Sequence, residues 1–119
     1  EKDNSFWNGW FLLGWGHRRC GRFQEAKKAF LKAAALQDPP PPDLLNELAI
    51  SHMELNEFPE SLRCLEEALK LEPENTKVLS NMGIVLLRMD KKEEAEGVFK
   101  TILEFDPDDP IAKKYLEDM

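Results

Sequence analysis

The chain has 119 residues, of which 42% are hydrophobic and 33% are charged, and this length suits one domain with its own core. A net charge of −7 works against a basic face that could neutralise phosphates, so no nucleic acid partner is expected. The two cysteines, Cys20 and Cys64, form no CxxC pair and predict free thiols in a reducing, cytoplasmic location. No segment has the roughly 20 apolar residues of a membrane span, so no membrane partner is expected either.

The first predicted helix reads WNGWFLLGWGHRRC and begins near Trp7. Its apolar residues recur at spacings of three and four, which places Trp10 and Leu13 on one face of the helix, toward the core. A second segment, GRFQEAKKAFLKAAALQDPP, carries Ala26 and Phe30 at the same spacing. The pattern therefore predicts two helices joined by a tight turn.

Two more helix pairs follow, because the sequence repeats itself at a shift of 34 or 35 residues. Their first helices read PDLLNELAISHMEL and TKVLSNMGIVLLRM, and their second helices read NEFPESLRCLEEALKLEPEN and DKKEEAEGVFKTILEFDPDD. Each turn is centred on a residue type that accepts left-handed backbone at low cost. The turn residues are Gly21, Asn56 and Asp90. The shift also superposes Trp10 with Leu45 and Leu79, Leu13 with Leu48 and Met82, and Phe30 with Leu65 and Phe99.

Prolines mark the ends of the units. The run PPPP at residues 39–42 could be a polyproline ligand for another domain, but its place between two helices favours a rigid connector. Near the end of the chain, Asp109 and Pro110 predict the cap and the first residue of one more helix. We expect its apolar residues to cover the exposed flank of the third unit. These residues are Ile111, Tyr115 and Leu116.

The pattern resembles the tetratricopeptide repeat, in which W-x2-L-G-x2-Y precedes A-x3-F-x2-A and a closing Pro. The first unit is the closest copy, with Trp10, Leu13, Gly14, Ala26, Phe30 and Ala33 at matching positions. The resemblance implies an all-α fold: a right-handed superhelix of three helix-turn-helix units at about 7–40, 42–75 and 76–109, with a capping helix at about 110–119. Residues 1–119 would then form a single repeat domain. Because the chain begins at Glu1 and not at Met, we expect it to be part of a longer protein.

Two histidines stand where the family has a core Tyr. His17 and His52 fall at the same position of successive units, and a metal ion between them would need further ligands that the sequence does not supply. A packed, hydrogen-bonded imidazole in each unit is the favoured interpretation. His17 and Cys20 could in principle pair as base and nucleophile, but no orienting Asp or Asn is placed beside them. We therefore expect no catalytic residue, no metal, no cofactor, and so no enzyme.

In the resembling family, the first helices line a concave wall that binds a peptide or an amphipathic helix. A helical projection selects the side chains of each first helix that point away from the second helix. The candidate partner-binding residues are Asn8, Phe11, Trp15 and Arg18, then Asn46, Ile50 and Met53, and then Lys77, Ser80, Ile84, Leu87 and Arg88. The chain is expected to be a protein–protein interaction scaffold for a protein or peptide partner. Alternatively, some of these side chains pack against the capping helix, a neighbouring unit or a second copy.

The family also has a clamp of Lys, Asn and Arg side chains that grips the C-terminal carboxylate of heat-shock chaperones. At the clamp positions this chain has Phe11, Trp15, Glu47, Lys77 and Asn81, so only Lys77 matches. A ligand that ends in an acidic tail is therefore disfavoured, and an extended apolar peptide or an amphipathic helix is favoured.

Self-association is the alternative function. Phe6, Trp7 and Leu12 lie on or beside the first helix with no preceding unit to cover them. Exposed apolar patches of this kind often mark an interface. A homodimer through these residues, or docking within a larger assembly, would bury them.

Overall fold

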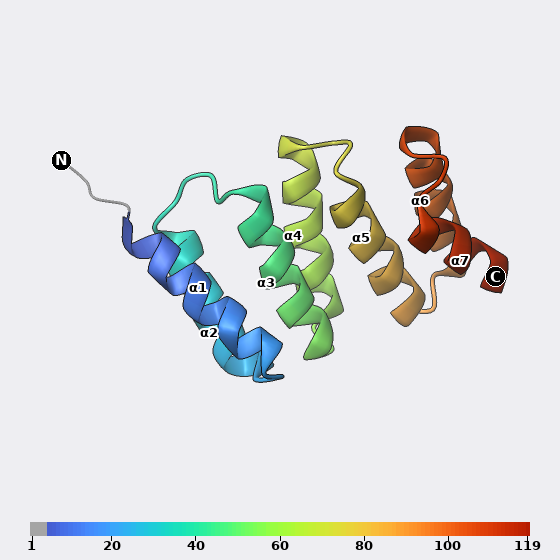
Figure 1. Cartoon of the computed structure of the whole chain (residues 1–119). Helices are drawn as coiled ribbons and strands as arrows, with labels where there is room; N and C mark the ends of the chain where they lie inside the picture. The colour runs from blue at the N-terminus through green and yellow to red at the C-terminus, as the bar shows by residue number, and fades with distance from the viewer. Residues whose placement is uncertain (1–4) are drawn as a thin grey trace.

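The helices of the protein pack in pairs that follow one another along the long axis of the molecule (Figure 1). The computed structural model describes residues 5–119, within which the chain forms seven α-helices and no strand. The helices are α1 (Ser5–Arg19), α2 (Phe23–Ala35), α3 (Pro42–Glu54), α4 (Phe58–Leu71), α5 (Thr76–Arg88), α6 (Lys92–Phe105) and α7 (Pro110–Asp118). The prediction of an all-α fold is confirmed. None of the helices between residues 5 and 119 is long and apolar enough to cross a membrane.

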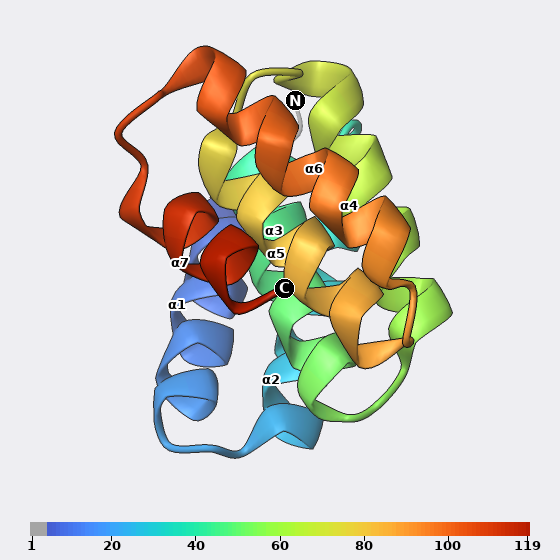
Figure 2. The same ribbon diagram turned by 90° about the vertical axis from the view of Figure 1, so that its right-hand side faces the viewer.

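Each unit is a helix pair, and the pairs stack on one another. Helix α1 packs on α2, α3 on α4, and α5 on α6, while α3 also contacts α2 and α5 also contacts α4. Helix α7 packs on α6 and closes the row. In Figure 2, α4 and α6 lie on one side of the molecule and α1 and α7 on the other. We call the surface built by the odd-numbered helices the inner face.

The turns within the units repeat one geometry. Gly21, Asn56 and Asp90 have φ angles of 78°, 62° and 62°, so all three adopt the left-handed backbone that the sequence predicted. The residue after each turn donates its backbone N–H to a carbonyl in the last turn of the first helix, at 2.8 Å in every unit. These bonds satisfy carbonyls that a helix end would otherwise leave unpaired. The donors and acceptors are Arg22 to His17, Glu57 to His52 and Lys91 to Leu86.

Two glycines are required by close packing inside a unit. A Cβ added at Gly14 would lie 2.7 Å from Cδ1 of Phe30, and one at Gly83 would lie 2.5 Å from Cζ of Phe99. Both phenyl side chains are fully buried. Each ring therefore fills the space that a larger residue would need, which explains why a glycine recurs at this position of the first helix.

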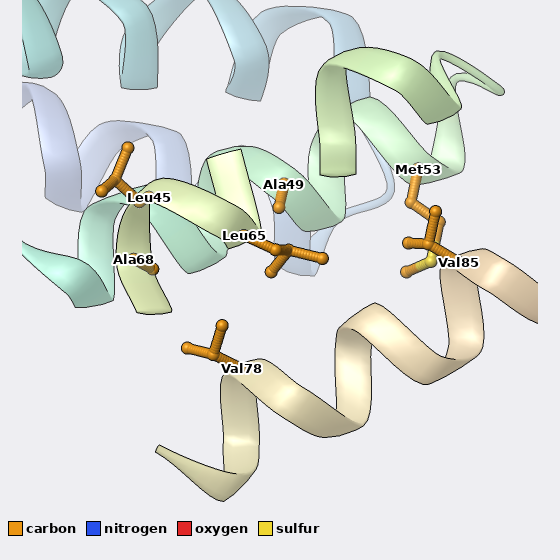
Figure 3. Close-up of a cluster of buried hydrophobic side chains, with 7 residues drawn as sticks. All are labelled: Leu45, Ala49, Met53, Leu65, Ala68, Val78 and Val85. Atoms are coloured by element: carbon orange, nitrogen blue, oxygen red, sulfur yellow. The ribbon is translucent and has the colours of Figure 1, made fainter. Parts of the chain in front are cut away.

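The core consists of three clusters of buried side chains, each of which includes residues from more than one unit or from the capping helix. The central cluster joins α3, α4 and α5 (Figure 3). Its members are Leu45, Ala49, Met53, Leu65, Ala68, Val78 and Val85. Because the clusters span the junctions between units, each unit depends on its neighbour for burial, as expected for a stacked repeat.

Helix α7 covers the end of the third unit. The Oδ1 atom of Asp109 caps it by accepting hydrogen bonds from the backbone N–H groups of Ile111 and Ala112, each at 3.0 Å. The ring of Tyr115 stacks on Phe99 with centroids 4.9 Å apart. Ala112 is fully buried, whereas Ile111 is about half exposed. Tyr115 and Leu116 pack against the third unit as expected, whereas Ile111 contributes less, because the small Ala112 occupies the buried contact.

The side of α1 that carries Phe6, Leu12 and Leu13 has no covering helix among residues 5–119. Leu13, predicted as core, is 48% exposed, although its equivalent Leu48 is buried in one cluster with residues of α2. Phe6 and Leu12 are 70% and 57% exposed. The prediction for Leu13 was wrong because this position is buried by contact with a preceding unit, a contact that α1 lacks in the described part of the chain.

Candidate functional site

The candidate partner-binding side chains lie on α1, α3 and α5, but the structure exposes them to different degrees. The exposed ones are Asn8, Trp15, Lys77 and Arg88, and the partly buried ones are Phe11, Arg18, Ile50, Ile84 and Leu87. The buried ones are Asn46, Met53 and Ser80. The first two groups retain surface that a partner could contact, whereas the third group retains little, with Ser80 reaching the surface only in the lining of a cleft.

Met53 is a core residue and offers no anchor to a partner. Its side chain is 5% exposed and belongs to the central cluster, where Val85 of the next unit also lies (Figure 3). Asn46 is 4% exposed, and its Oδ1 accepts a hydrogen bond of 2.8 Å from Nδ2 of Asn81. Ser80 is buried as well. The prediction of Met53 as a binding residue is wrong, because α5 stacks over the position that a projection of α3 alone leaves open.

The aromatic residues of α1 divide into a free ring and a packed ring. Trp15 is 38% exposed, and the guanidinium of Arg19 lies over its indole at 4.9 Å from the ring centroid. Phe11 is partly buried and packs between Trp7 and Phe30, with both centroids at 5.9 Å. Trp15 is therefore the aromatic residue on this face that is available to a partner, while Phe11 supports the first unit from within.

The charged side chains of the inner face largely pair with one another between units. Arg18 of α1 forms an ion pair with Glu47 of α3. Nη2 of Arg88 lies 3.7 Å from Oε2 of Glu54, which joins α5 to α3. Lys77 is exposed and forms no ion pair with another residue between 5 and 119. These pairs join α1 and α5 to α3 and leave Lys77 as a cation of α5 without an ion pair among residues 5–119.

A cleft of about 280 Å³ lies between α5 and α7. Its lining residues are Thr76, Lys77, Ser80, Asn81, Ile84, Asp109 and Ile111. The cleft brings together predicted residues of α5 with Ile111, a residue that the sequence had predicted to cover the flank of the third unit. A larger hollow of about 570 Å³ at residues 72–76 is lined by one loop alone, so it lacks the opposing wall that a ligand site needs.

The two histidines are each held by a hydrogen bond. Nδ1 of His52 lies 2.8 Å from Oε1 of Glu57, and Nζ of Lys27 donates to both Glu57 oxygens at 3.1 and 3.0 Å. The hydrogen bond with His52, and then the one from Lys27, hold the pKa of Glu57 below its ordinary value. Nε of Arg22 donates to Nδ1 of His17 at 3.2 Å. Within residues 5–119 the His52 contact ties α3 to the turn that follows it, and Lys27 ties that turn to α2.

The described residues do not assemble a metal site or an activated thiol. No group of three or more His, Cys, Asp and Glu side chains between residues 5 and 119 could hold a metal ion. Both cysteines are free, and burial raises the pKa of the Cys64 thiol to about 11. A thiol with that pKa is protonated at neutral pH and is a poor nucleophile.

Comparison with known proteins identifies the repeat. A family model described as tetratricopeptide repeat matches residues 7–39 and 42–75, and a second model of the same description matches residues 62–117. The chain belongs to the tetratricopeptide repeat family. A curated relative is the interferon-induced protein with tetratricopeptide repeats 3 of Mus musculus, which is 34% identical over 93 residues. That alignment covers 76% of this chain and 23% of the relative, so the chain spans about a quarter of its length.

Solved structures share the same tetratricopeptide fold. The first TPR of Spaghetti (RPAP3), bound to the HSP90 peptide SRMEEVD, has a TM-score of 0.88 at 24% identity and covers 98% of this chain and 91% of that chain. The Arabidopsis OM64 TPR domain has a TM-score of 0.90 at 17% identity, covering 98% and 96%. At these identities the likeness establishes the arrangement of the helices.

Proposed function

We propose that this tetratricopeptide repeat chain is a binding module, without catalysis of its own, that holds a peptide or amphipathic helix on its inner face. The observation that carries the proposal is the exposed Trp15 indole beneath Arg19, with the partly buried Ile50 and Ile84 at the equivalent positions of α3 and α5. A large aromatic ring beside apolar side chains is the usual composition of a binding hot spot. The peptide bound to the Spaghetti domain supports this mode of binding.

The chemistry of the inner face favours a mainly apolar ligand with few acidic groups. Arg18 and Arg88 are already neutralised by carboxylates of α3, so they add little attraction for an acidic peptide. Lys77 remains free at the edge of the α5–α7 cleft, where Ile84 and Ile111 supply apolar walls. A ligand with an acidic group at Lys77 and apolar side chains directed toward Trp15 would match the charge at the α5 end of the inner face and the aromatic ring at its α1 end.

Panning a random phage-displayed peptide library on the immobilised chain tests this function. We expect the recovered peptides to be rich in apolar and aromatic residues and to bind Trp15→Ala at least about tenfold more weakly, because hot-spot side chains carry about 2 kcal/mol or more. Leu31→Ala is the matched control, since Leu31 is similarly exposed but lies on α2, away from the inner face. Peptides that bind Trp15→Ala as tightly as the wild type place the ligand elsewhere and contradict the proposal.

The acidic peptide SRMEEVD, which the Spaghetti domain binds, serves as a second probe. Four of the five clamp positions differ here, with Phe11, Trp15, Glu47 and Asn81 in place of the family's polar and basic residues. We therefore expect binding of SRMEEVD to this chain to be much weaker than binding of the selected peptides. Tight binding of SRMEEVD would overturn the preference for an apolar ligand.

We further propose that residues 1–119 form one repeat domain with units at about 7–40, 42–75 and 76–109 and a cap at 110–119, and that it works in the cytoplasm. Two free cysteines support the reducing location. Self-association is the second candidate function, and the exposure of Phe6 and Leu12 favours it. Trp7, the third residue predicted for that contact, is partly buried against Phe11 and contributes less surface.

A further inference from the structure

Two glycines of α1 have no role in the packing of residues 5–119. Gly9 and Gly16 lie inside the helix, where glycine is less stable than alanine because it loses more backbone freedom on folding. A Cβ added at either position would meet no atom within 4 Å. Gly14 of the same helix, in contrast, is required by the Phe30 ring. The contacts among the described residues therefore explain Gly14 and give no packing reason for a glycine at position 9 or 16.

These glycines frame exposed leucines on one side of α1. At the angular step of an α-helix, Gly9, Leu12, Leu13 and Gly16 fall within about 100° of the helix circumference. Phe6 borders the same strip, and all of these residues are exposed. We call Phe6, Gly9, Leu12, Leu13 and Gly16 the open stripe. It contains no charged residue, although a third of the residues in the chain are charged.

The equivalent stripes of α3 and α5 are helix-packing surfaces. The residues equivalent to Gly9 are Leu44 and Val78, and those equivalent to Gly16 are Ser51 and Val85. All four are buried where one unit stacks on the preceding one. A helix pair stacked in that way on α1 would contact glycine at positions 9 and 16, whereas the equivalent positions of α3 and α5 carry larger side chains. The open stripe is instead suited to a helix whose backbone approaches more closely.

The stripe has the symmetry of a surface that binds itself. Its pattern, G-x2-L-L-x2-G, reads the same in both directions. A two-fold axis between Leu12 and Leu13 would set Gly9 of one helix against Gly16 of the other, so that the same patch of both copies meets itself, as in a two-fold interface. Charge favours the antiparallel orientation, because α1 ends in Arg19, which forms no ion pair with another residue between 5 and 119, and a parallel pair would bring the two Arg19 side chains together.

We propose that the open stripe is a self-association surface on which α1 of a second copy of this chain packs antiparallel, with close backbone contact at Gly9 and Gly16. The proposal rests on the self-association kept above as the second candidate function, and it supplies the residues and the symmetry of that contact. A contact through one helix is small compared with a standard interface, so we expect a dissociation constant in the micromolar range.

Sedimentation equilibrium over a wide range of protein concentrations tests the contact. We expect a monomer–dimer equilibrium in the wild type and a monomer in Leu12→Glu. Gly16→Leu should weaken the dimer at least about tenfold without lowering the melting temperature, because Gly16 is exposed and a Cβ added there would meet no described atom within 4 Å. Leu31→Glu, on α2, is the control that leaves the dimer unchanged. A wild type that stays monomeric, or a dimer that survives Leu12→Glu, overturns the proposal.

Disulfide trapping tests the orientation. In a Cys20→Ser background, a mixture of Gly9→Cys and Gly16→Cys chains should form a linked dimer under oxidising conditions, whereas neither variant should link to itself. Linking of Gly9→Cys with itself indicates parallel helices and contradicts the antiparallel contact. Peptide binding is measured on the same proteins, so a monomer that still binds selected peptides refutes the self-association and leaves the inner-face function intact.

Discussion

Replacing Gly83 with alanine tests how tightly the third unit is packed. The added Cβ would lie 2.5 Å from Cζ of Phe99, well inside the separation of about 3.5 Å at which two carbon atoms make favourable contact. The ring must therefore shift by about 1 Å. It is fully buried and stacked on Tyr115 at 4.9 Å, so the shift disturbs α7 as well. Overpacking of this kind costs about 1–3 kcal/mol, while alanine gains about 1 kcal/mol of helix propensity over glycine.

We expect a net loss of up to about 2 kcal/mol in the free energy of unfolding of Gly83→Ala, measured by urea unfolding followed by circular dichroism. Gly97→Ala is the matched control, because it lies in helix α6 and its Cβ meets no atom within 4 Å. That variant should gain up to about 1 kcal/mol. Adding Phe99→Leu to Gly83→Ala should relieve the contact with the new methyl group. Equal stabilities of Gly83→Ala and Gly97→Ala would refute the inference that the Phe99 ring excludes a side chain at position 83.

Two further predictions concern ionisable groups. Glu57→Gln removes the carboxylate that joins His52 and Lys27. The hydrogen bonds with these two residues lower the pKa of Glu57 below 4.5 in the folded protein. The stability that these hydrogen bonds add is therefore fully present above about pH 4.5, and it is lost as the pH falls through the lower pKa of the folded state. The melting temperature of the wild type should therefore fall more steeply in acid than that of the variant, and parallel curves would contradict this. A thiol reagent at neutral pH should label the exposed Cys20 and spare Cys64, because the pKa of the Cys64 thiol is raised to about 11. Cys64 should react once urea unfolds the chain. Equal labelling rates of the two cysteines in the folded protein would show that Cys64 is accessible.

The sequence predicted those features that depend on local backbone rules. Asn56 and Asp90 tolerate left-handed backbone, and both adopt it at the turns where the repeat pattern placed them. Asp109 has a short side chain that can reach back to free N–H groups, and it caps α7 as predicted. The period of 34 to 35 residues then fixed the order of the helix pairs, because each pair must bury its apolar faces against its neighbours.

The features that the sequence missed depend on how one unit sits on the next. A helical projection gives the direction of Met53 relative to α4, but its burial is decided by α5, which belongs to another unit. Leu13 has the sequence environment of a core residue and is exposed because no helix lies over it in the described part of the chain. The ion pair between Arg18 and Glu47 likewise joins residues far apart in the sequence. Helical spacing carries no information on these angles and distances between units.

The first unit carries both proposed surfaces, and they are separable by single substitutions. The open stripe and the inner-face residues around Trp15 are centred about 120° apart on α1, so both can be occupied at once. Trp15→Ala should weaken peptide binding and leave the dimer intact, whereas Leu12→Glu should abolish the dimer and leave peptide binding intact. A melting temperature near the wild-type value is expected for Leu12→Glu, since Leu12 is 57% exposed, whereas Trp15→Ala should lower it, since Trp15 is only 38% exposed and its ring buries apolar surface. If each substitution removed both activities, α1 would present one continuous binding surface, and the division of its apolar residues between two partners would be wrong.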